Sequence, residues 1–371
     1  CRSLSTADFV AVDTEFMREQ TYWPELCLIQ IASDNLKAII DPFSPNLDLN
    51  SFFELMANPN VAKVFHAARQ DIEIFFSRTG LIPSPIFDTQ IAAAVCGYGE
   101  SVSYMKLVKD ITGYEIDKSS RFTDWARRPL SEKQLIYALG DVTYLCLIYK
   151  ELISRLQKSG RETWLQEEMA NLIKPETYTT RPEDAWKRLK LRIKNKKSFA
   201  VFIEVASWRE KLAQKQNVPR NRILRDESLY DIASQCPVTL DQVSELRSLS
   251  EGFARSSRAK EIIEAVRIGL ERDPKSLPTF DRGEQITPEA SATIELLKVL
   301  LKSASARHQV ASRLIADNED LERIARENNP DVLALSGWRR KLFGEDALRL
   351  KKGQLALSLS EGEVVMFDIE K

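Results

Sequence analysis

Histidine is scarce in this sequence, with only His66 and His308 among 371 residues. A zinc centre built on histidine needs several such side chains close together, so this class of site is excluded. A metal bound by this protein must instead rest on carboxylates, which are the preferred ligands of hard cations such as Mg²⁺ and Mn²⁺.

Cysteine is also sparse, and no two cysteines stand in a Cys-x-x-Cys spacing. An odd, dispersed set is typical of reduced thiols, so we expect a cytoplasmic protein. The five residues are Cys1, Cys27, Cys96, Cys146 and Cys236.

Long apolar runs and nucleotide-binding loops are missing as well. No run of about 18 apolar residues occurs, so we expect no transmembrane helix and no membrane partner. The pattern Gly-x-x-x-x-Gly-Lys-Ser/Thr is absent, so no helicase motor is expected. No obligate protein partner is indicated, and we expect a monomer. The chain begins at Cys1 without a methionine, and we expect that residues precede it.

Charge is unevenly distributed, although the net charge is only −1. Residues 1–150 carry 14 basic and 19 acidic side chains, whereas residues 181–225 carry 14 basic and 4 acidic ones, a local charge of +10. An excess of this size predicts a surface that binds nucleic acid. A solvated helix face rich in lysine and arginine is the alternative.

Two carboxylates follow the first apolar stretch of the chain. Residues 9–12 form an apolar, β-prone run, and Asp13 and Glu15 come directly after it. Side chains alternate along a strand, so these two acids point to the same side. Like charges so placed repel each other unless a cation lies between them. A solvated strand end with two chance acids is the alternative.

The surrounding pattern predicts a mixed sheet with helices packed against it. Residues 26–31 and 36–40 read as two further strands of an antiparallel meander. A helix over residues 49–57 separates them from a strand over residues 61–65, which should therefore run parallel to an earlier strand. We expect a short strand or helix entry at residues 87–89 and helices beyond it.

Two proline-containing linkers, 174–182 and 273–288, divide the chain into three parts. We expect domains at residues 1–173, 183–272 and 289–371. The last two parts resemble each other, because residues 223–233 are echoed by residues 314–325, and both are helical by period. The tail, from Gly353 to Lys371, alternates like a small hairpin.

Three more side chains join the two N-terminal acids. Asp71 lies in the first turns of the helix after the 61–65 strand, near the same end of the sheet if the strands are neighbours. Tyr137 and Asp141 are four residues apart on a long helix that Ser131 caps, so they share a face. Four acids packed together favour a pair of divalent cations. Two such cations can stabilise both the attacking and the leaving oxygen of a phosphoryl displacement.

These motifs together resemble the DEDD 3′–5′ exonuclease superfamily, in its tyrosine-bearing branch. Asp-x-Glu at 13–15, Asp71 and Tyr-x-x-x-Asp at 137–141 stand in the family's order, and residues 123–130 resemble bacterial ribonuclease D in particular. The C-terminal pair is similar to HRDC domains, the second in degenerate form. Any one motif is weak, but the resemblance spans nearly the whole chain.

The resemblance implies a ribonuclease-H-like α/β fold, with a mixed five-stranded sheet, followed by two all-α HRDC bundles. It implies removal of RNA 3′ nucleotides as nucleoside 5′-monophosphates, with precursor tRNA as the expected substrate and two divalent cations, Mg²⁺ or Mn²⁺, as cofactors. Asp13, Glu15, Asp71 and Asp141 match the metal-binding acids. Tyr137 matches the tyrosine that orients the attacking water.

Other residues are candidates for substrate contact. Two of them follow the acids and would pack either on the terminal nucleotide or in the core, one is a glutamine in an apolar strand, and three are basic residues near the third motif, where a solvated loop is the alternative. The histidine is expected to make a structural hydrogen bond. The set is Phe16, Met17, Gln30, His66, Lys118, Arg121 and Arg128.

Two other functions stay open at this point. A DNA exonuclease would use the same acids, although no polymerase or helicase motif accompanies them. A non-catalytic RNA-binding protein that kept the fold is disfavoured, because none of the four acids is missing.

Overall fold

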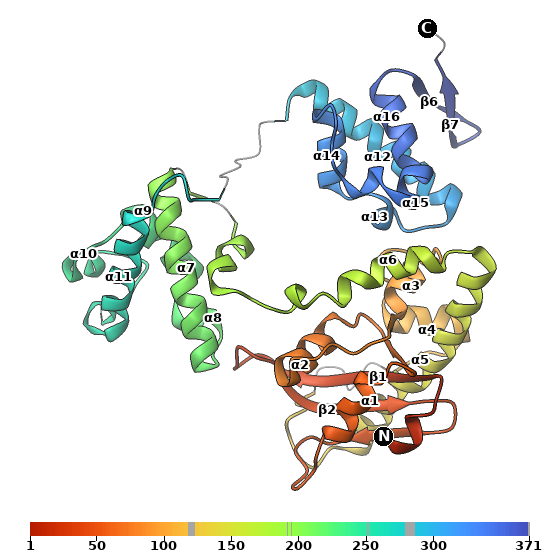
Figure 1. Cartoon of the computed structure of the whole chain (residues 1–371), viewed down its shortest axis with the longest axis horizontal. Coiled ribbons are helices and arrows are strands. Elements are labelled where there is room, and N and C mark those ends of the chain that lie inside the picture. Colours follow the sequence, from red (N-terminus) through yellow and green to blue (C-terminus); the bar gives the residue numbers. More distant parts are fainter. Residues whose placement is uncertain (118–122, 191, 194, 251, 279–285, 370–371) are drawn as a thin grey trace.

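A five-stranded sheet forms the centre of the N-terminal part of the protein (Figure 1). The computed structural model describes all residues except 118–122, 191, 194, 251, 279–285 and 370–371. The strand order is β3-β2-β1-β4-β5, with β1 in the middle. The strands are β1 (Phe9–Met17), β2 (Glu25–Ala32), β3 (Lys37–Ile40), β4 (Ala62–Phe65) and β5 (Ile86–Asp88).

The pairing directions follow from the connections. Short loops join β1, β2 and β3, which pair antiparallel. Helix α1 (Asn50–Ala57) lies between β3 and β4, and β4 pairs parallel to β1. Helix α2 (Arg69–Thr79) similarly precedes β5, which pairs parallel to β4. The mixed sheet expected from the sequence is confirmed, and residues 86–88 form its fifth strand.

Alternation along β1 divides its side chains between two cores. Val10 and Val12 pack with α1 and α2, whereas Phe9 and Ala11 pack with the helices on the other face. Asp13 and Glu15 continue the second series, so they face the second set of helices. That set is α3 (Thr89–Val95), α4 (Tyr104–Thr112), α5 (Glu132–Ser159) and α6 (Glu162–Leu172).

Helix α5 is the longest element on that face, and both of its ends are capped. The Ser131 hydroxyl accepts from the backbone of Gln134, whose side chain accepts in return from the Ser131 backbone. The helix ends at Gly160, which takes a left-handed conformation with φ 64°. The helix therefore starts where the sequence predicted, after Ser131.

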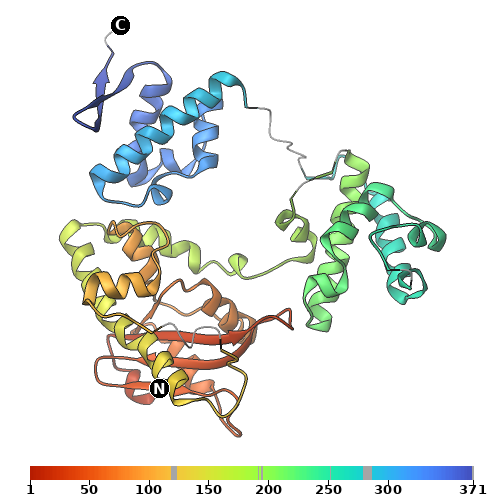
Figure 2. The ribbon, with the colours of Figure 1, turned by 180° about the vertical axis from the view of Figure 1, so that it is seen from behind.

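The next part of the chain is an all-helical unit, from η3 to α11, that touches the sheet domain at the β1–β2 hairpin (Figure 2). Tyr22 of the hairpin is 5% exposed and belongs to the apolar core of this unit. Its elements are η3 (Pro182–Arg188), α7 (Lys196–Gln216), α8 (Arg220–Ile223), α9 (Asp226–Gln235), α10 (Leu240–Ser244), η4 (Phe253–Arg255) and α11 (Ser257–Glu271).

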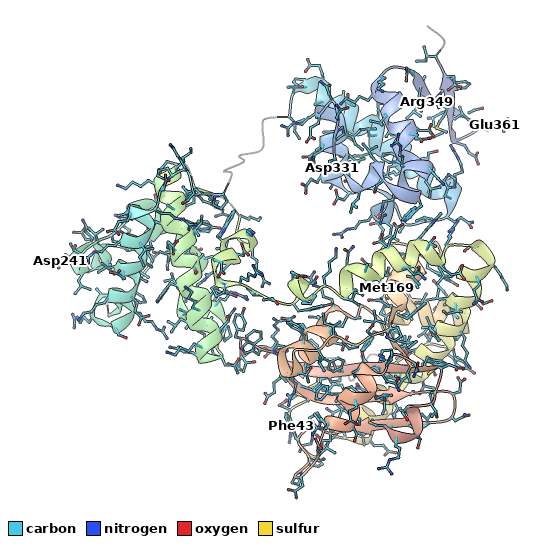
Figure 3. The ribbon with its side chains drawn as sticks, in the orientation of Figure 1. Phe43, Met169, Asp241, Asp331, Arg349 and Glu361 are labelled. Atoms are coloured by element: carbon cyan, nitrogen blue, oxygen red, sulfur yellow. The ribbon has the colours of Figure 1, made fainter. Side chains whose placement is uncertain are left out.

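The C-terminal unit packs on the sheet domain through α6. The rings of Trp164 and Trp338 stack at 4.5 Å, and Arg339 pairs with Glu167 at 3.2 Å. Met169 of α6, labelled in Figure 3, contacts the β5 backbone on the other side. The elements are α12 (Pro288–His308), α13 (Ser312–Ile315), α14 (Asn318–Arg326), η5 (Leu333–Leu335), α15 (Gly337–Arg339), η6 (Arg340–Gly344), α16 (Glu345–Lys351), β6 (Leu355–Ser360) and β7 (Glu363–Asp368).

The last two strands form the hairpin that the alternating tail predicts. Within the described part of the chain, no helix combines the length and apolar character that a membrane span requires.

Candidate active site

Three carboxylates meet where α5 crosses the end of the sheet. One oxygen each from Asp13, Glu15 and Asp141 lies within 4.8 Å of the other two. They line a cavity of about 470 Å³. The sequence placed the two N-terminal acids at the end of their strand, and β1 continues past both to Met17. Their side chains are therefore held by a paired backbone rather than by a loop.

Tyr137 lies one turn before Asp141 and lines the same cavity. Its ring contacts that of Trp125, with 6.2 Å between centroids, and Trp125 is 3% exposed. The tyrosine is thus braced on one side and open to the cavity on the other. Sequence spacing correctly predicted that Tyr137 and Asp141 share a face.

Asp71 stands apart from the three-acid cluster. It lies in the first turn of α2, on the far side of β1, and it is 6% exposed. Its carboxylate accepts a hydrogen bond of 2.5 Å from the Thr14 hydroxyl. Thr14 points away from Asp13 and Glu15 because side chains alternate along β1. Asp71 therefore contacts β1, the strand that carries Asp13 and Glu15, but it is not part of the three-acid cluster.

Burial and mutual repulsion act on these acids together. Burial, and then the neighbouring Asp141 carboxylate, raise the pKa of Asp13 well above its usual range. Burial, and then Asp13, raise the pKa of Asp71 in the same direction. A divalent cation would relieve this repulsion, and carboxylate oxygens are suitable donors for Mg²⁺ or Mn²⁺. The residues present therefore fit such a cofactor.

His66 holds the wall of the cavity and carries no positive charge near neutral pH. Its Nε2 lies 3.1 Å from the Val102 carbonyl, which can only accept, so Nε2 bears the proton. Its Nδ1 lies 2.9 Å from the Thr89 hydroxyl. Burial lowers the pKa of His66 to about 4. The structural hydrogen bond expected from the sequence is present.

The turn after His66 is shaped by a buried acid. Ala67 takes a left-handed conformation with φ 59°. The Asp88 carboxylate accepts from the backbone of Ala67 at 3.1 Å and Ala68 at 2.8 Å. Asp88 thus fixes the start of α2 and with it the position of Asp71, a structural role.

The residues just before α4 and at its start line the cavity, and the sequence did not predict this. Helix α4 is Tyr104–Thr112. The Tyr104 hydroxyl donates to the backbone carbonyls of Asp141 and Gly140, which ties α4 to the turn of α5 that carries the acid. A polar run, Ser101-Val-Ser-Tyr104, was the available signal. The residues that line the cavity beside the predicted ones are Thr14, Ala67, Gln90, Ser101, Ser103, Tyr104, Met105 and Leu145.

The basic residues near the third motif divide into two groups. Arg128 is saturated, because it forms two 2.7 Å bonds to Asp41 and also donates to the carbonyls of Cys27, Trp125 and Arg127. Its guanidinium also stacks on Phe43, labelled in Figure 3. The sequence predicted that Arg128 holds an RNA phosphate. In the structure this side chain instead links its own loop to Asp41 and to the backbone of Cys27. Lys118 and Arg121 lie outside the described residues.

Neither of the two residues after Glu15 lines the cavity. Phe16 lies against the core on the α1 and α2 side, and Met17 packs near Trp125. Of the two interpretations open from the sequence, core packing therefore fits the structure. A β-bulge between Glu15 and Phe16 marks the point where the strand changes register.

Gln30 is fully buried on the face of the sheet that α5 covers. It pairs directly with Asp13 across the β1–β2 ladder, so the two side chains point to the same face. Both polar atoms of its amide have no hydrogen-bond partner among the described residues. An unpaired buried amide is destabilising.

A mixed sheet with β1 at its centre carries three acids, from β1 and α5, and a tyrosine lies one turn away from the third; this arrangement suits metal-dependent cleavage of a phosphodiester. Residues 1–157 match the family of 3′–5′ exonuclease domains, and residues 198–266 match the HRDC domain family.

Relatives and a solved structure agree over the full chain. Ribonuclease D of Nitrobacter hamburgensis is 51% identical over 98% of this chain and 95% of its own length. Ribonuclease D of Bartonella henselae is 47% identical over 98% and 89%, respectively. The crystal structure of Escherichia coli RNase D, an exoribonuclease involved in structured RNA processing, superposes with a TM-score of 0.80 at 28% identity, covering 95% of each chain.

This chain belongs to the ribonuclease D family and is a 3′–5′ exoribonuclease. The 3′–5′ exonuclease family uses divalent metals, which the three-acid cluster fits.

Proposed function

We propose that Asp13, Glu15, Asp71 and Asp141 hold two divalent cations, Mg²⁺ or Mn²⁺, and that the protein removes nucleoside 5′-monophosphates from RNA 3′ ends. The convergence of three carboxylates and Tyr137 on one cavity supports this most directly. Precursor tRNA is the proposed substrate, in the cytoplasm and with the protein as a monomer.

Each side chain has a distinct task in this proposal. When bound, the cations supply charge neutralisation at the scissile phosphate and make a nearby water more acidic. Asp13 and Glu15 keep their ligand atoms on one side of β1, because the β2 ladder fixes the strand. Tyr137 orients the attacking water with its hydroxyl. Tyr104 holds the α5 turn at Asp141.

Asp71 is proposed to serve the second cation. Its hydrogen bond with Thr14 currently satisfies one oxygen, and its repulsion with Asp13 already links the two acids electrostatically. A cation between them would remove the repulsion that raises both pKa values. The chain therefore has one three-acid cluster ready for a cation and a fourth acid close behind it.

Gln30 is proposed to be a core residue beside Asp13 rather than a substrate contact, because it is fully buried and its amide makes no hydrogen bond within the described part of the chain. We expect Gln30→Leu to keep or raise the unfolding temperature, because it removes an unpaired buried amide whose cost is on the order of 1–3 kcal/mol. We also expect divalent binding near the wild-type value, since the amide makes no recorded hydrogen bond to Asp13. Calorimetric Mn²⁺ titration checks this. Markedly weaker Mn²⁺ binding would instead show that Gln30 positions Asp13.

The domain division is proposed as 1–173, 183–272 and 289–371, joined by linkers at 174–182 and 273–288, with the last domain a second HRDC bundle. The two helical units share one order of elements. Helices α7 and α12 each have 21 residues and end at a left-handed residue. A four-residue helix and then one of nine or ten residues follow in both cases.

Digestion of end-labelled nucleic acid tests the activity. We expect 5′-labelled single-stranded RNA to give a descending ladder in Mg²⁺, because the enzyme removes residues from the 3′ end. A 3′-phosphate should block the reaction, since it adds charge where the terminal hydroxyl binds. A faster ladder on DNA of the same sequence would favour the alternative of a DNA exonuclease, and an unchanged rate with the 3′-phosphate would argue against exonucleolytic action.

A further inference from the structure

A second cavity, of about 410 Å³, lies between the β1–β2 hairpin and the first helical unit. Four arginines line it, each from a different element. Arg18 follows β1, Arg188 ends η3, Arg209 lies on α7 and Arg220 begins α8. The catalytic cavity shares none of its residues.

A buried network fixes this cavity to the exonuclease domain. The Tyr22 hydroxyl donates to Glu210, which is 1% exposed, and Arg220 forms two 2.6 Å bonds to the same carboxylate. The Arg220 guanidinium also stacks on the Tyr22 ring at 4.6 Å. The Asn217 side chain accepts from the backbone of Tyr22 and Trp23 at 3.1 and 3.0 Å. The exonuclease domain and the first helical unit therefore share a buried, hydrogen-bonded interface.

The charges around the cavity leave an excess of one positive charge. Arg18 pairs with Glu73, Arg220 with Glu210 and Arg209 with Asp226. Within the part of the chain that the structure describes, the recorded bond of Arg188 goes to the Thr180 hydroxyl at 2.7 Å and not to a carboxylate. A single anionic group would complete this set.

Arg209 provides a second indication of a ligand. Its side chain is 4% exposed, and one terminal nitrogen donates to Asp226 at 2.6 Å and to the Leu224 carbonyl at 3.0 Å. Its Nε is buried with no hydrogen-bond partner among the described residues. An unpaired donor of a buried cation is costly, and phosphate oxygens, like carboxylate oxygens, are acceptors that match the geometry of arginine.

We propose that this cavity binds one backbone phosphate of the RNA, upstream of the 3′ end that lies at the acids. The inference rests on the proposed function. Strand β1 carries Asp13 and Glu15 and then runs into Arg18, five and three residues further on. At roughly 3.4 Å per residue, these positions are about 17 and 10 Å apart along the strand. β1 therefore fixes the distance along the strand between the acids and Arg18, with no linker between them.

The test compares Arg188→Gln with Lys187→Gln. Each change removes one positive charge, but Lys187 pairs with Asp184 and does not line the cavity. Anisotropy of labelled single-stranded RNA in Ca²⁺, over a series of salt concentrations, gives affinity and salt slope. Arg188→Gln should weaken binding roughly tenfold and lower the slope by about 0.7, the value for one phosphate contact on a single strand. Lys187→Gln should leave the slope unchanged.

Length dependence separates a bound RNA phosphate from a free anion. In the wild type, long RNA should bind better than a dinucleotide, which cannot reach both cavities, and Arg188→Gln should reduce that difference. The control Lys187→Gln should leave that difference and the rate of dinucleotide cleavage in Mg²⁺ at the wild-type values. Equal loss of slope in both variants, or stabilisation by inorganic phosphate without any dependence on RNA length, would overturn the proposal. Failure of the wild type to cleave RNA would instead refute the proposed function.

Discussion

Asp141→Asn is expected to lower the single-turnover rate of RNA cleavage by at least 10²–10³-fold, the order of magnitude for removing one preorganised stabilising group. Asp141 closes the cluster with Asp13 and Glu15, and it is the one cluster ligand that comes from α5. An amide is neutral and a poorer ligand for a hard cation. The substitution should therefore weaken metal binding and remove charge stabilisation together.

Tyr137→Phe is the matched control on the same helix face. It removes a hydroxyl that positions water but no metal ligand, so a loss of about 10²-fold is expected, the lower end for such groups. RNA affinity measured in Ca²⁺ should stay near the wild-type value, since the basic surface is untouched. An Asp141→Asn variant that cleaved at close to the wild-type rate would exclude this cluster as the active site.

Removal of divalent cations should abolish cleavage altogether. The cavity is walled by carboxylates, and His66, with its pKa lowered to about 4, is unsuited to act as an acid near neutral pH. Excess EDTA should therefore stop the 5′-labelled ladder, and Mg²⁺ or Mn²⁺ should restore it. Full activity in EDTA would contradict the metal-dependent mechanism.

The same removal should change the pH dependence of stability. The pKa values of Asp13 and Asp71 are raised in the folded state, so that state binds more protons than the unfolded chain above the ordinary value of 3.8. In EDTA, stability should consequently fall as pH rises from that value through the folded pKa values. A cation at 100 times its Kd should add about 2.7 kcal/mol at neutral pH. Thermal unfolding between pH 5 and 8 measures both the pH dependence of stability and the stabilisation by the cation. Asp13→Asn should flatten the dependence of stability on pH in the absence of metal.

The periodicity of strands and helices was enough to predict which residues of the active site share a face. Residues two apart on a strand and four apart on a helix share a face whatever the rest of the fold does. The pairs Asp13–Glu15 and Tyr137–Asp141 were therefore predictable, as was the helix start at Ser131, because caps are local. The basic excess over residues 181–225 was likewise readable from composition.

Long-range contacts decided the rest, because they depend on where distant segments meet. The Thr14 hydroxyl donates to Asp71 across 57 residues of sequence, and Arg128 donates to Asp41 across 87. Neither pairing has a local pattern, so the sequence assigned both Asp71 and Arg128 without their actual partners.

The sequence by itself determined the set of acids, their order and the side on which each pair faces, since these follow from covalent spacing and backbone geometry. Only the tertiary structure decided how many acids form one cluster, that Tyr104 ties α4 to α5, and that the β1–β2 hairpin buries Tyr22 against Glu210. Burial and electrostatic interaction depend on distances in space, and these are fixed only when the sheet, α5 and the helical units have packed together.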